Sequence, residues 1–513
     1  MNYDVIVVGS GSGGATIATR LSEDPNRSVL LLEAGPDYPN IDRLPPDVKF
    51  NHGTGTDLGI GLNSAVGGPH DWQFTGTATA TSSTPMRVPR GRVTGGTSAI
   101  NGSVFLRGLP EDFDGWASRG NDEWAYENVF PYFNKIETDT NYSGDYHGNA
   151  GPIMVRRFMP DELMNDQAAF SDACRDAGFP DSPDHNDPDS TGIGPLPLNN
   201  PDDIRWSTNI GYLSQARHRL NLTIKPDCTV HKLVFEGTRA SGVVVESSGE
   251  IFTVRGNEII LSAGPIASPQ LLMLSGIGPS TDLGKLGIPV LIDSPGVGQN
   301  LRDHVTVHTR WHAKDDFEMP GNDVGPQKVA LRYTATNSGQ RNDMITVMRW
   351  NSPERQIVMS AGLYLAKSSG EIRLTSTDVS VQPFLYYNFL DDPSDIKRLR
   401  DGVRLNLRLS EHKSFEPIIG DLIDPTPADV LTDAALDSWM MRNVETMHHI
   451  SGTAKMGPDS DEMAVLDQYC RVRGVEGLRV ADGSVMPDCI RANTNATIIM
   501  IGERIADFIK NDS

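Results

Sequence analysis

The stretch YDVIVVGSGSGGATIATRLSEDPNRSVLLLEAG, residues 3–35, predicts the first unit of the fold. It contains two continuous apolar runs, DVIVV and SVLLLEA, which are typical of strands buried on both faces. A glycine turn and a helix lie between them, and we expect the helix over about 13–23, before Pro25. The pattern therefore predicts a βαβ unit within a parallel sheet.

The glycine turn of this unit has the spacing of a dinucleotide cradle. The first glycine of G-x-G-x-x-G allows a tight turn, the second lets backbone approach a pyrophosphate, and the third lets helix pack close to strand. Two further amides open the helix, where its dipole favours phosphate. An acidic residue closes the second strand, where such a group takes ribose hydroxyls. The predicted dinucleotide-binding residues are Gly9, Gly11, Ser12, Gly13, Gly14 and Glu33.

The cradle alone does not distinguish FAD from NAD. No second G-x-G-x-x-G follows a strand elsewhere in the sequence. A flavoprotein reduced by NAD(P)H usually carries two such units. A single unit therefore indicates either a pyridine-nucleotide enzyme or a flavoenzyme that takes hydride directly from its substrate.

The bulk properties of the chain indicate a soluble, globular protein of more than one domain. It has 513 residues, 38% of them hydrophobic, and a net charge of −22. Single cores stop growing near about 250–300 residues, and an acidic chain is a poor partner for nucleic acid. We find no apolar run long enough for a transmembrane helix and no signal peptide. The cysteines, at 174, 228, 470 and 489, lack CxxC spacing and fit a reducing compartment, so we predict a cytoplasmic protein.

The patterns along the rest of the chain predict two domains built from interleaved segments. A strand meander is expected over 221–264, with turns at Gly237 and Gly249, and a largely antiparallel sheet over about 306–390. Helices are expected at 161–177, 393–410 and 497–512. We therefore predict an α/β fold, mixed with α+β character, in which a substrate domain with an antiparallel sheet is inserted into a Rossmann-like domain. The nucleotide-binding domain would comprise 1–155, 200–305 and 445–513, and the substrate domain 156–199 and 306–444.

Five further motifs carry a family resemblance that runs essentially from end to end. They are PRGRVTGGTSAINGSVFLRG (89–108), SAGPIASPQLLMLSGIGP (262–279), PGVGQNLRDH (295–304), HHISGTAKMG (448–457) and LRVADGSVMPDCIRANTNATIIMIGERIAD (478–507). In this order they resemble the signatures of the glucose–methanol–choline (GMC) flavin oxidoreductases, and the chain is most similar to bacterial alcohol oxidases of that family. Thr94 is one departure, because the family usually has an aliphatic residue there.

The resemblance implies FAD as the cofactor and gives several segments a role in holding it. Some members bond FAD covalently through a histidine before the asparagine of the first signature. Ile100 stands at that position and cannot form the bond, so we predict non-covalent FAD. The further cofactor-binding residues implied by the resemblance are Trp72, Gly95, Gly96, Asn101, Val230, Asp482, Asn495 and Thr497.

The catalytic pair implied by the resemblance is His449 and Asn493, which lie 44 positions apart. Oxidation of a CH–OH group requires loss of the hydroxyl proton and transfer of a hydride to flavin N5. His449 would handle the proton and Asn493 would bind the substrate oxygen. His448 would point away or sideways if the segment were extended, because neighbouring strand side chains face opposite sides, and we expect it to be a structural or pocket-lining histidine.

Several alternatives accompany this prediction. His304, His308 and His312 would share one face of a strand, but four residues there span about 13 Å, too far for a shared metal ion. The Asp-rich segment 181–191 lacks the order of a calcium loop, so we predict no metal site. A lyase of the hydroxynitrile type and a photodecarboxylase occur on the same fold. The identity of the alcohol, the choice between O2 and another electron acceptor, and the oligomeric state stay open.

Overall fold

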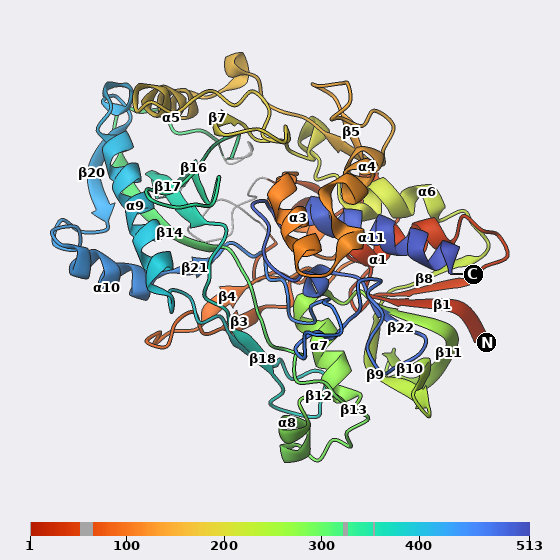
Figure 1. Ribbon diagram of the computed structural model, residues 1–513. Helices are drawn as coiled ribbons and strands as arrows, with labels where there is room; N and C mark the ends of the chain where they lie inside the picture. The colour runs from red at the N-terminus through yellow and green to blue at the C-terminus, as the bar shows by residue number, and fades with distance from the viewer. Residues whose placement is uncertain (1, 52–64, 322–326, 352–353, 513) are drawn as a thin grey trace.

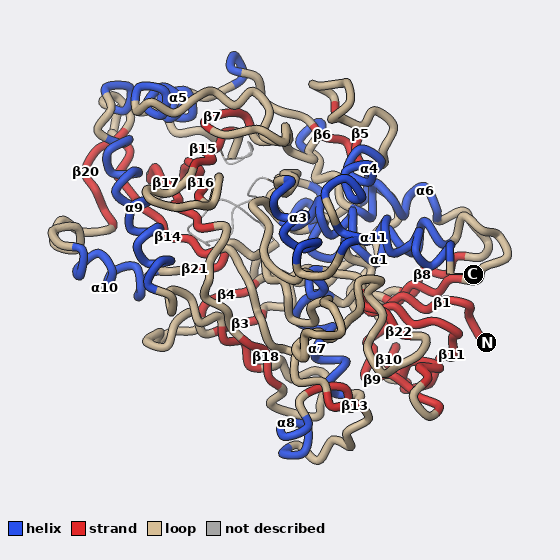
Figure 2. The backbone as a smooth tube through the Cα atoms, in the orientation of Figure 1, coloured by secondary structure: helices blue, strands red, loops and turns tan. Residues whose placement is uncertain are grey.

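The computed structural model of the protein describes residues 2–51, 65–321, 327–351 and 354–512. Two large sheets organise this part of the chain, and Figures 1 and 2 show them on opposite sides of the molecule. Among the described residues, none of the helices combines the length and apolar character that a membrane crossing requires.

The first sheet contains the predicted βαβ unit. Its strand order is β8–β2–β1–β11–β10–β9, and β22 pairs with β11 beside that path. The strands β8, β2, β1, β11 and β22 run parallel, whereas β9 and β10 continue antiparallel from β11. The strands are β1 (Asn2–Val8), β2 (Val29–Leu32), β8 (Leu222–Lys225), β9 (Cys228–Glu236), β10 (Arg239–Ser247), β11 (Glu250–Leu261) and β22 (Leu478–Val480).

The two predicted turns of the meander are confirmed, but its first predicted strand is divided into two strands, β8 and β9. Hairpins at Gly237 and Gly249, both with positive φ, join β9, β10 and β11. The preceding strand β8 instead pairs in parallel with β2. Pro226 has no amide for a ladder and Asp227 has a φ of 52°, so the chain turns between β8 and β9 rather than continuing as one strand.

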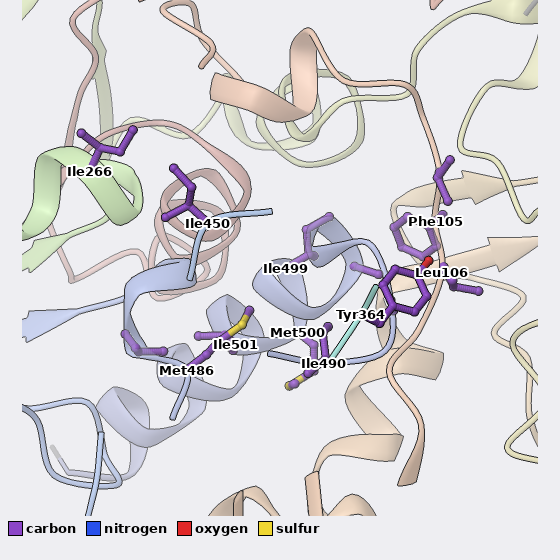
Figure 3. Close-up of a cluster of buried hydrophobic side chains, with 14 of the residues drawn as sticks. Phe105, Leu106, Ile266, Tyr364, Ile450, Met486, Ile490, Ile499, Met500 and Ile501 are labelled. Atoms are coloured by element: carbon purple, nitrogen blue, oxygen red, sulfur yellow. The ribbon is translucent and has the colours of Figure 1, made fainter. Parts of the chain in front are cut away.

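Two helices from opposite ends of the sequence pack together beside this sheet. They are α1 (Ser12–Leu21) and α11 (Thr494–Asn511), which lie side by side in Figure 1. A Cβ at Gly502 would lie 2.9 Å from the carbonyl oxygen of Gly13, so this glycine permits the close approach. In Figure 3, Ile499, Met500 and Ile501 of α11 belong to a buried apolar cluster with Phe105. The end of the chain is therefore part of the core.

The second sheet is antiparallel throughout, with the order β20–β14–β17–β16–β15–β7 and β21 paired to β14. Helix α9 (Pro393–Ser410) packs on one of its faces, where a Cβ at Gly402 would lie 3.1 Å from that of Ala361. The strands are β7 (Gly192–Pro195), β14 (Val305–Ala313), β15 (Val329–Tyr333), β16 (Met344–Asn351), β17 (Gln356–Leu363), β20 (Ile419–Asp424) and β21 (Glu445–Thr446).

One strand expected in the second sheet lies elsewhere. Strand β18 (Glu371–Arg373) pairs with β19 (Phe384–Tyr386) in a separate two-stranded sheet. The amide of Ile372 donates to the carbonyl of Gly298, and Leu301 bridges to Gly370. These bonds to the segment before β14 hold β18 away from the larger sheet. The prediction for this strand's position is therefore wrong.

The remaining elements connect and cover the two sheets. The longer helices include α3 (Pro110–Ser118), α4 (Tyr126–Ile136), α5 (Asn165–Asp176), α7 (Gly264–Leu274), α8 (Ser280–Lys285) and α10 (Asp433–Asn443), with short α2 (Pro46–Lys49) and α6 (Ser214–Ala216). Short strand pairs are formed by β3 (Phe74–Gly76) with β4 (Met86–Val88), β5 (Glu137–Asp139) with β6 (Ile153–Val155), and β12 (Ile277–Gly278) with β13 (Ile292–Asp293). The bounds of the two proposed domains stay a prediction.

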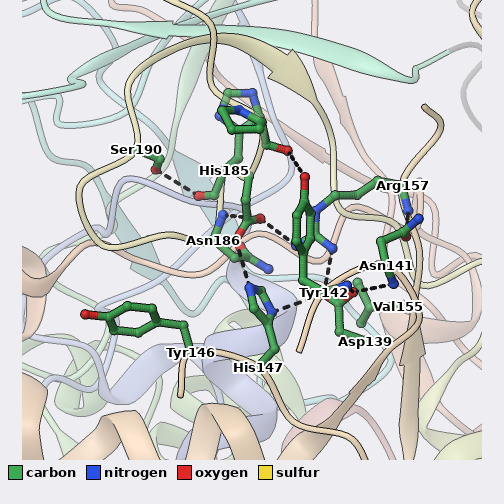
Figure 4. A network of polar contacts seen from close by, with 12 residues as sticks. Asp139, Asn141, Tyr142, Tyr146, His147, Val155, Arg157, His185, Asn186 and Ser190 are labelled. Atoms are coloured by element: carbon green, nitrogen blue, oxygen red, sulfur yellow. Dashed lines mark hydrogen bonds and ion pairs between the residues drawn. The ribbon is translucent and has the colours of Figure 1, made fainter. Parts of the chain in front are cut away.

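A buried ion-pair network fastens the segment after α4 to the chain that leads into β7 (Figure 4). His147 contacts three carboxylates, Glu137 at 3.1 Å, Asp139 at 3.2 Å and Asp184 at 2.9 Å. Arg157 binds both aspartates at 2.6 Å. Burial opposes a charged imidazole, but the three carboxylates raise the pKa of His147 to about 10. Glu137, Asp139 and His147 have the spacing of metal ligands, yet a protonated imidazole and Arg157 already supply the opposing charge.

We expect His147→Gln to lower the thermal midpoint by several degrees, because removing one partner of a buried ion pair costs about 3 kcal/mol. The stability supplied by a raised pKa is fully present below the unfolded value near 6.5 and is lost as pH rises toward 10. The difference between wild type and variant should therefore shrink over that interval in calorimetry. His231→Gln, in a partly exposed pair with Glu246, is the control and should change the midpoint little.

Candidate active site

A cavity of about 1210 Å³ lies between the two sheets. Its walls include the glycine turn after β1, the first turn of α7, and strands β14, β16 and β17 of the second sheet. This volume exceeds the roughly 300–1,000 Å³ of an ordinary small-molecule pocket. The cavity therefore has room for a large cofactor together with a substrate.

The glycine turn has the shape that a cradle for phosphates requires. A Cβ at Gly9, whose φ is +95°, would lie 2.4 Å from the carbonyl oxygen of Ser262, and one at Gly14 would lie 1.9 Å from that of Gly9. These two glycines permit the turn and the close packing of helix on strand. Gly11 differs, because its nearest neighbour would be the Cα of Gly96 at 3.9 Å. The space over Gly11 belongs to the cavity, as expected where a ligand approaches backbone.

Two helix N-termini face the same cavity. Helices α1 and α11 both lack a side-chain cap and an acidic residue in the first turn, so their amides and positive dipole ends are available to an anion. Ser12 donates to Oδ1 of Asn495 at 2.7 Å, which links the two helices. Nδ2 of Asn495 is buried without a hydrogen-bond partner. This donor and the two helix ends fit a cofactor that carries phosphates and electronegative ring atoms.

Both predicted acidic residues lie on the cavity wall and are engaged by their own loops. Glu33 accepts hydrogen bonds from the amide and hydroxyl of Ser10 and from the amide of Gly35. Asp482 accepts from Gly264, Ser268 and Ser484, and so ties the start of α7 to the loop before α11. Burial raises the pKa of both carboxyls. Asp482 therefore holds two segments of the cavity wall together. One carboxylate oxygen of Glu33 can still accept a further hydrogen bond.

The other predicted cofactor residues fall into two groups, those that lie behind the cavity wall and those that line the cavity. Gly95 has a φ of +98°, and its amide donates to the carbonyl oxygen of Ser10. Gly14 packs against the backbone of Gly9. Thr497 is fully buried in the first turns of α11, and its hydroxyl has no partner. Ile100, at the position of the family's bonding histidine, lines the cavity. The predicted residues that line it are Gly9, Gly11, Ser12, Gly13, Glu33, Trp72, Gly96, Asn101, Val230, Asp482 and Asn495.

The adjacent histidines both line the cavity, as the pocket-lining alternative for His448 predicts, whereas the expectation that it points away or sideways is wrong. That expectation assumed an extended segment. Strand β21 ends at Thr446, and His448 has a φ of 68°, in the left-handed region. The left-handed residue breaks the alternation of side chains, and the His448 amide donates to the hydroxyl of Thr446. The turn therefore presents both imidazoles to the same space.

His449 and Asn493 lie together at the cavity wall. Nδ2 of Asn493 is 3.0 Å from Nε2 of His449. Asn493 occupies the N-cap position of α11, but its side chain makes no cap hydrogen bond. Its amide is therefore directed to the imidazole rather than to the helix.

A third side chain, His304, completes a chain of hydrogen bonds. Its Nε2 lies 2.7 Å from the carbonyl oxygen of Ile490, which can only accept, so this nitrogen carries the proton. Nδ1 of a neutral His304 is then an acceptor, and it lies 2.9 Å from Nδ1 of His449. His449 must donate from Nδ1, which leaves a lone pair on Nε2 toward Asn493. The chain thus fixes the tautomer of His449.

The surroundings keep both imidazoles neutral. Burial lowers the pKa of His304 to about 3. Burial, together with His304, His448 and Arg90, lowers the pKa of His449 well below 6.5. Beneath them, the carboxylate of Asp303 accepts from the amide of His449 at 2.8 Å and from the hydroxyl of Thr446. At neutral pH the site therefore presents an unprotonated nitrogen that can accept a proton.

Sequence reasoning missed the part played by His304 and Asp303. We expected His304 to be structural and grouped it with His308 and His312. In the structure His304 and His308 are buried and His312 is exposed. The motif NLRDH in 295–304 was the available signal, but a motif does not state which side chain its histidine meets 145 positions later.

Comparisons with known proteins agree along the whole chain. Models of the GMC oxidoreductase family match residues 3–306 and 366–502. An oxygen-dependent choline dehydrogenase from Vibrio vulnificus (strain YJ016) is 35% identical over 540 residues, with 99% of this chain and 94% of that protein covered. The crystal structure of pyridoxine 4-oxidase from Mesorbium loti is similar with a TM-score of 0.91 and 27% identity, and each chain is covered to 99%. The fold is also that of the FAD-containing formate oxidase of Aspergillus oryzae RIB40, at 23% identity, a TM-score of 0.89, and coverage of 100% of this chain and 98% of that one.

We expect His304→Leu to slow reduction of the bound cofactor by alcohol on the order of a hundredfold, which is the scale of a general-base contribution. Leucine cannot accept from Nδ1 of His449, so the tautomer is no longer fixed. His304→Gln is the matched variant, because its amide can donate to Ile490 and accept from His449. Stopped-flow absorbance measures both rates, and equal losses in the two variants would contradict the assignment.

Proposed function

The chain belongs to the GMC oxidoreductase family, and on that premise we propose that His449 accepts the hydroxyl proton of an alcohol whose oxygen is bound by Asn493. Members of this family are FAD-dependent and oxidise alcohol groups. The product of the reaction is the corresponding carbonyl compound. The contact between Asn493 and the unprotonated Nε2 of His449 at the cavity wall carries this proposal.

The geometry gives the two side chains complementary roles. A hydroxyl group that replaces the hydrogen bond between them would accept from Nδ2 of Asn493 while its proton faces Nε2 of His449. Asparagine cannot act as a base, and its amide would stabilise the charge that develops on the oxygen. His449 becomes positively charged when it takes the proton. The carboxylate of Asp303, bonded to the amide of His449, offsets part of that charge.

The residues of the cavity fit FAD at a single extended site. Gly11 and the N-terminus of α1 would hold the pyrophosphate, Glu33 and Val230 the adenosine end, and Asn495 the end near His449. When bound, FAD supplies the acceptor for the hydride that leaves the carbinol carbon. Ile100 presents only hydrocarbon to the cavity, so we propose that the cofactor is held without a covalent bond. Reoxidation by O2 or another electron acceptor and a cytoplasmic location stay predictions.

The proposal predicts that His449→Ala keeps its FAD but is reduced by alcohol at least on the order of a hundredfold more slowly. The measurement is anaerobic bleaching of the flavin absorbance by a panel of primary alcohols. His312→Ala, at an exposed position of β14, is the control. A variant that bleaches as fast as wild type would remove His449 from the mechanism. Turnover without any change in flavin absorbance would instead indicate a lyase.

We also expect acid precipitation of the purified protein to release all of its FAD into the supernatant, because isoleucine at position 100 offers no atom for a flavin bond. Absorbance of the pellet and supernatant measures the partition. Yellow colour that stays with the denatured chain would contradict non-covalent binding.

A further inference from the structure

The face of the second sheet that looks into the cavity has an ordered arrangement of side chains. In the register of β14, β17 and β16, Thr306, Gly362 and Ile345 form one row and His308, Ser360 and Val347 the next, followed by Arg310, Val358 and Arg349. The first row lies beside Met447, since a Cβ at Gly362 would be 2.9 Å from its sulfur. Met447 is two residues from His449. The rows therefore lead away from Met447, and the two arginines lie in the third row.

Arg349 is the unusual member of this surface. It is 4% exposed, on the cavity wall, in the buried strand β16. Its Nη2 lies 3.2 and 3.4 Å from the two ring nitrogens of His308. Its Nε is buried without a partner, and among the described residues no carboxylate forms an ion pair with it. Burial, with Arg310 nearby, lowers the pKa of Arg349 to about 9, so the group is still a cation at neutral pH.

One neighbouring charge, the Glu445 carboxylate, partly offsets this cation, but the two groups form no ion-pair contact. Arg310, in the same row, is paired with Asp424 at 3.4 Å. Glu445 also lines the cavity, but its carboxylate contacts Nε2 of His308 at 3.4 Å. Burial alone would raise the pKa of Glu445, yet His308, Arg310 and Arg349 lower it to about 2. A buried guanidinium without an anion in direct contact is costly, and a ligand carboxylate would reduce that cost.

Resting on the proposed function, we infer that the substrates are alcohols that carry a carboxylate, which Arg349 binds two rows of the sheet away from the row beside Met447. The planar guanidinium matches a carboxylate in two parallel hydrogen bonds. A single negative charge fits better than a phosphate dianion, because the ionised Glu445 lies close by. Ile345 and Val347 would flank the hydrocarbon between the two ends.

The sheet register also sets the length of such a substrate. Ile345 and Arg349 are four residues apart along β16, about 13 Å, and the guanidinium leans back one row toward His308. The hydroxyl carbon and the carboxylate should then be roughly 7–10 Å apart. A short hydroxy acid such as glycolate cannot bridge that distance, whereas ω-hydroxyoctanoate can.

The test compares ω-hydroxyoctanoate with its methyl ester by anaerobic flavin reduction. In wild type we expect the acid to be used with a kcat/KM at least about tenfold above that of the ester, mainly through KM. Arg349→Gln should lower that ratio by about ten- to a hundredfold, the value of a hydrogen bond between charged groups. Arg349→Lys, which keeps the charge, should restore part of the ratio. FAD content measured by absorbance verifies that each variant is folded.

Arg310→Gln is the matched control, because it removes a positive charge from the same row of the sheet without touching the proposed contact. An equal fall of the ratio in Arg310→Gln and Arg349→Gln would overturn direct binding by Arg349. Equal use of the acid and the ester by wild type would overturn the inference while leaving the proposed alcohol oxidation intact. Failure of wild type to bleach with any alcohol would instead overturn the proposed function itself.

Discussion

The chemistry proposed for this protein depends on a chain of hydrogen bonds that runs from the carbonyl of Ile490 through His304 and His449 to the amide of Asn493. Each link has a fixed direction, because the first group can only accept and the last can donate. The two imidazoles between them are therefore held in one tautomer. An isolated buried histidine would be neutral but free to place its proton on either nitrogen. The chain removes that freedom and leaves the lone pair on the nitrogen that faces the cavity.

The groups of this chain come from three separate segments, and the two sheets bring those segments together. His304 immediately precedes β14, and His449 follows β21, which pairs with β14 through Thr446 and Val305. Asp303 then accepts from both Thr446 and His449, so the turn at His448 is held at both ends. Ile490 and Asn493 precede α11, whose position is fixed by its packing on α1. The site is thus located where the second sheet begins and the chain enters α11.

The sequence was sufficient for features that depend on local spacing or on motifs. Local spacing predicted the glycine cradle, the βαβ unit and helix α9. The family motifs predicted that His449 and Asn493 form a pair. The sequence was insufficient where a contact depends on distant segments. Strand β18 has strand-like composition, but its bonds to Gly298 and Leu301 place it outside the second sheet. His448 follows a strand, and only its hydrogen bond to Thr446 and its left-handed backbone show that it faces the cavity. Arg349 lies in an unremarkable strand sequence, and its missing ion pair is visible only once its neighbours are known.

The net charge of −22 and a buried cation in the cavity act at different ranges. Charges on the exposed surface are screened over about 10 Å at moderate ionic strength, so the acidic exterior weakly opposes the approach of an anion but does not reach into the interior. Arg349 is surrounded by protein, where the lower dielectric makes its interactions stronger than in water. Discrimination for a carboxylate would therefore be exerted after entry, through the lifetime of the bound substrate rather than through the rate of encounter. This separation lets one chain keep an acidic surface and still select an acidic ligand.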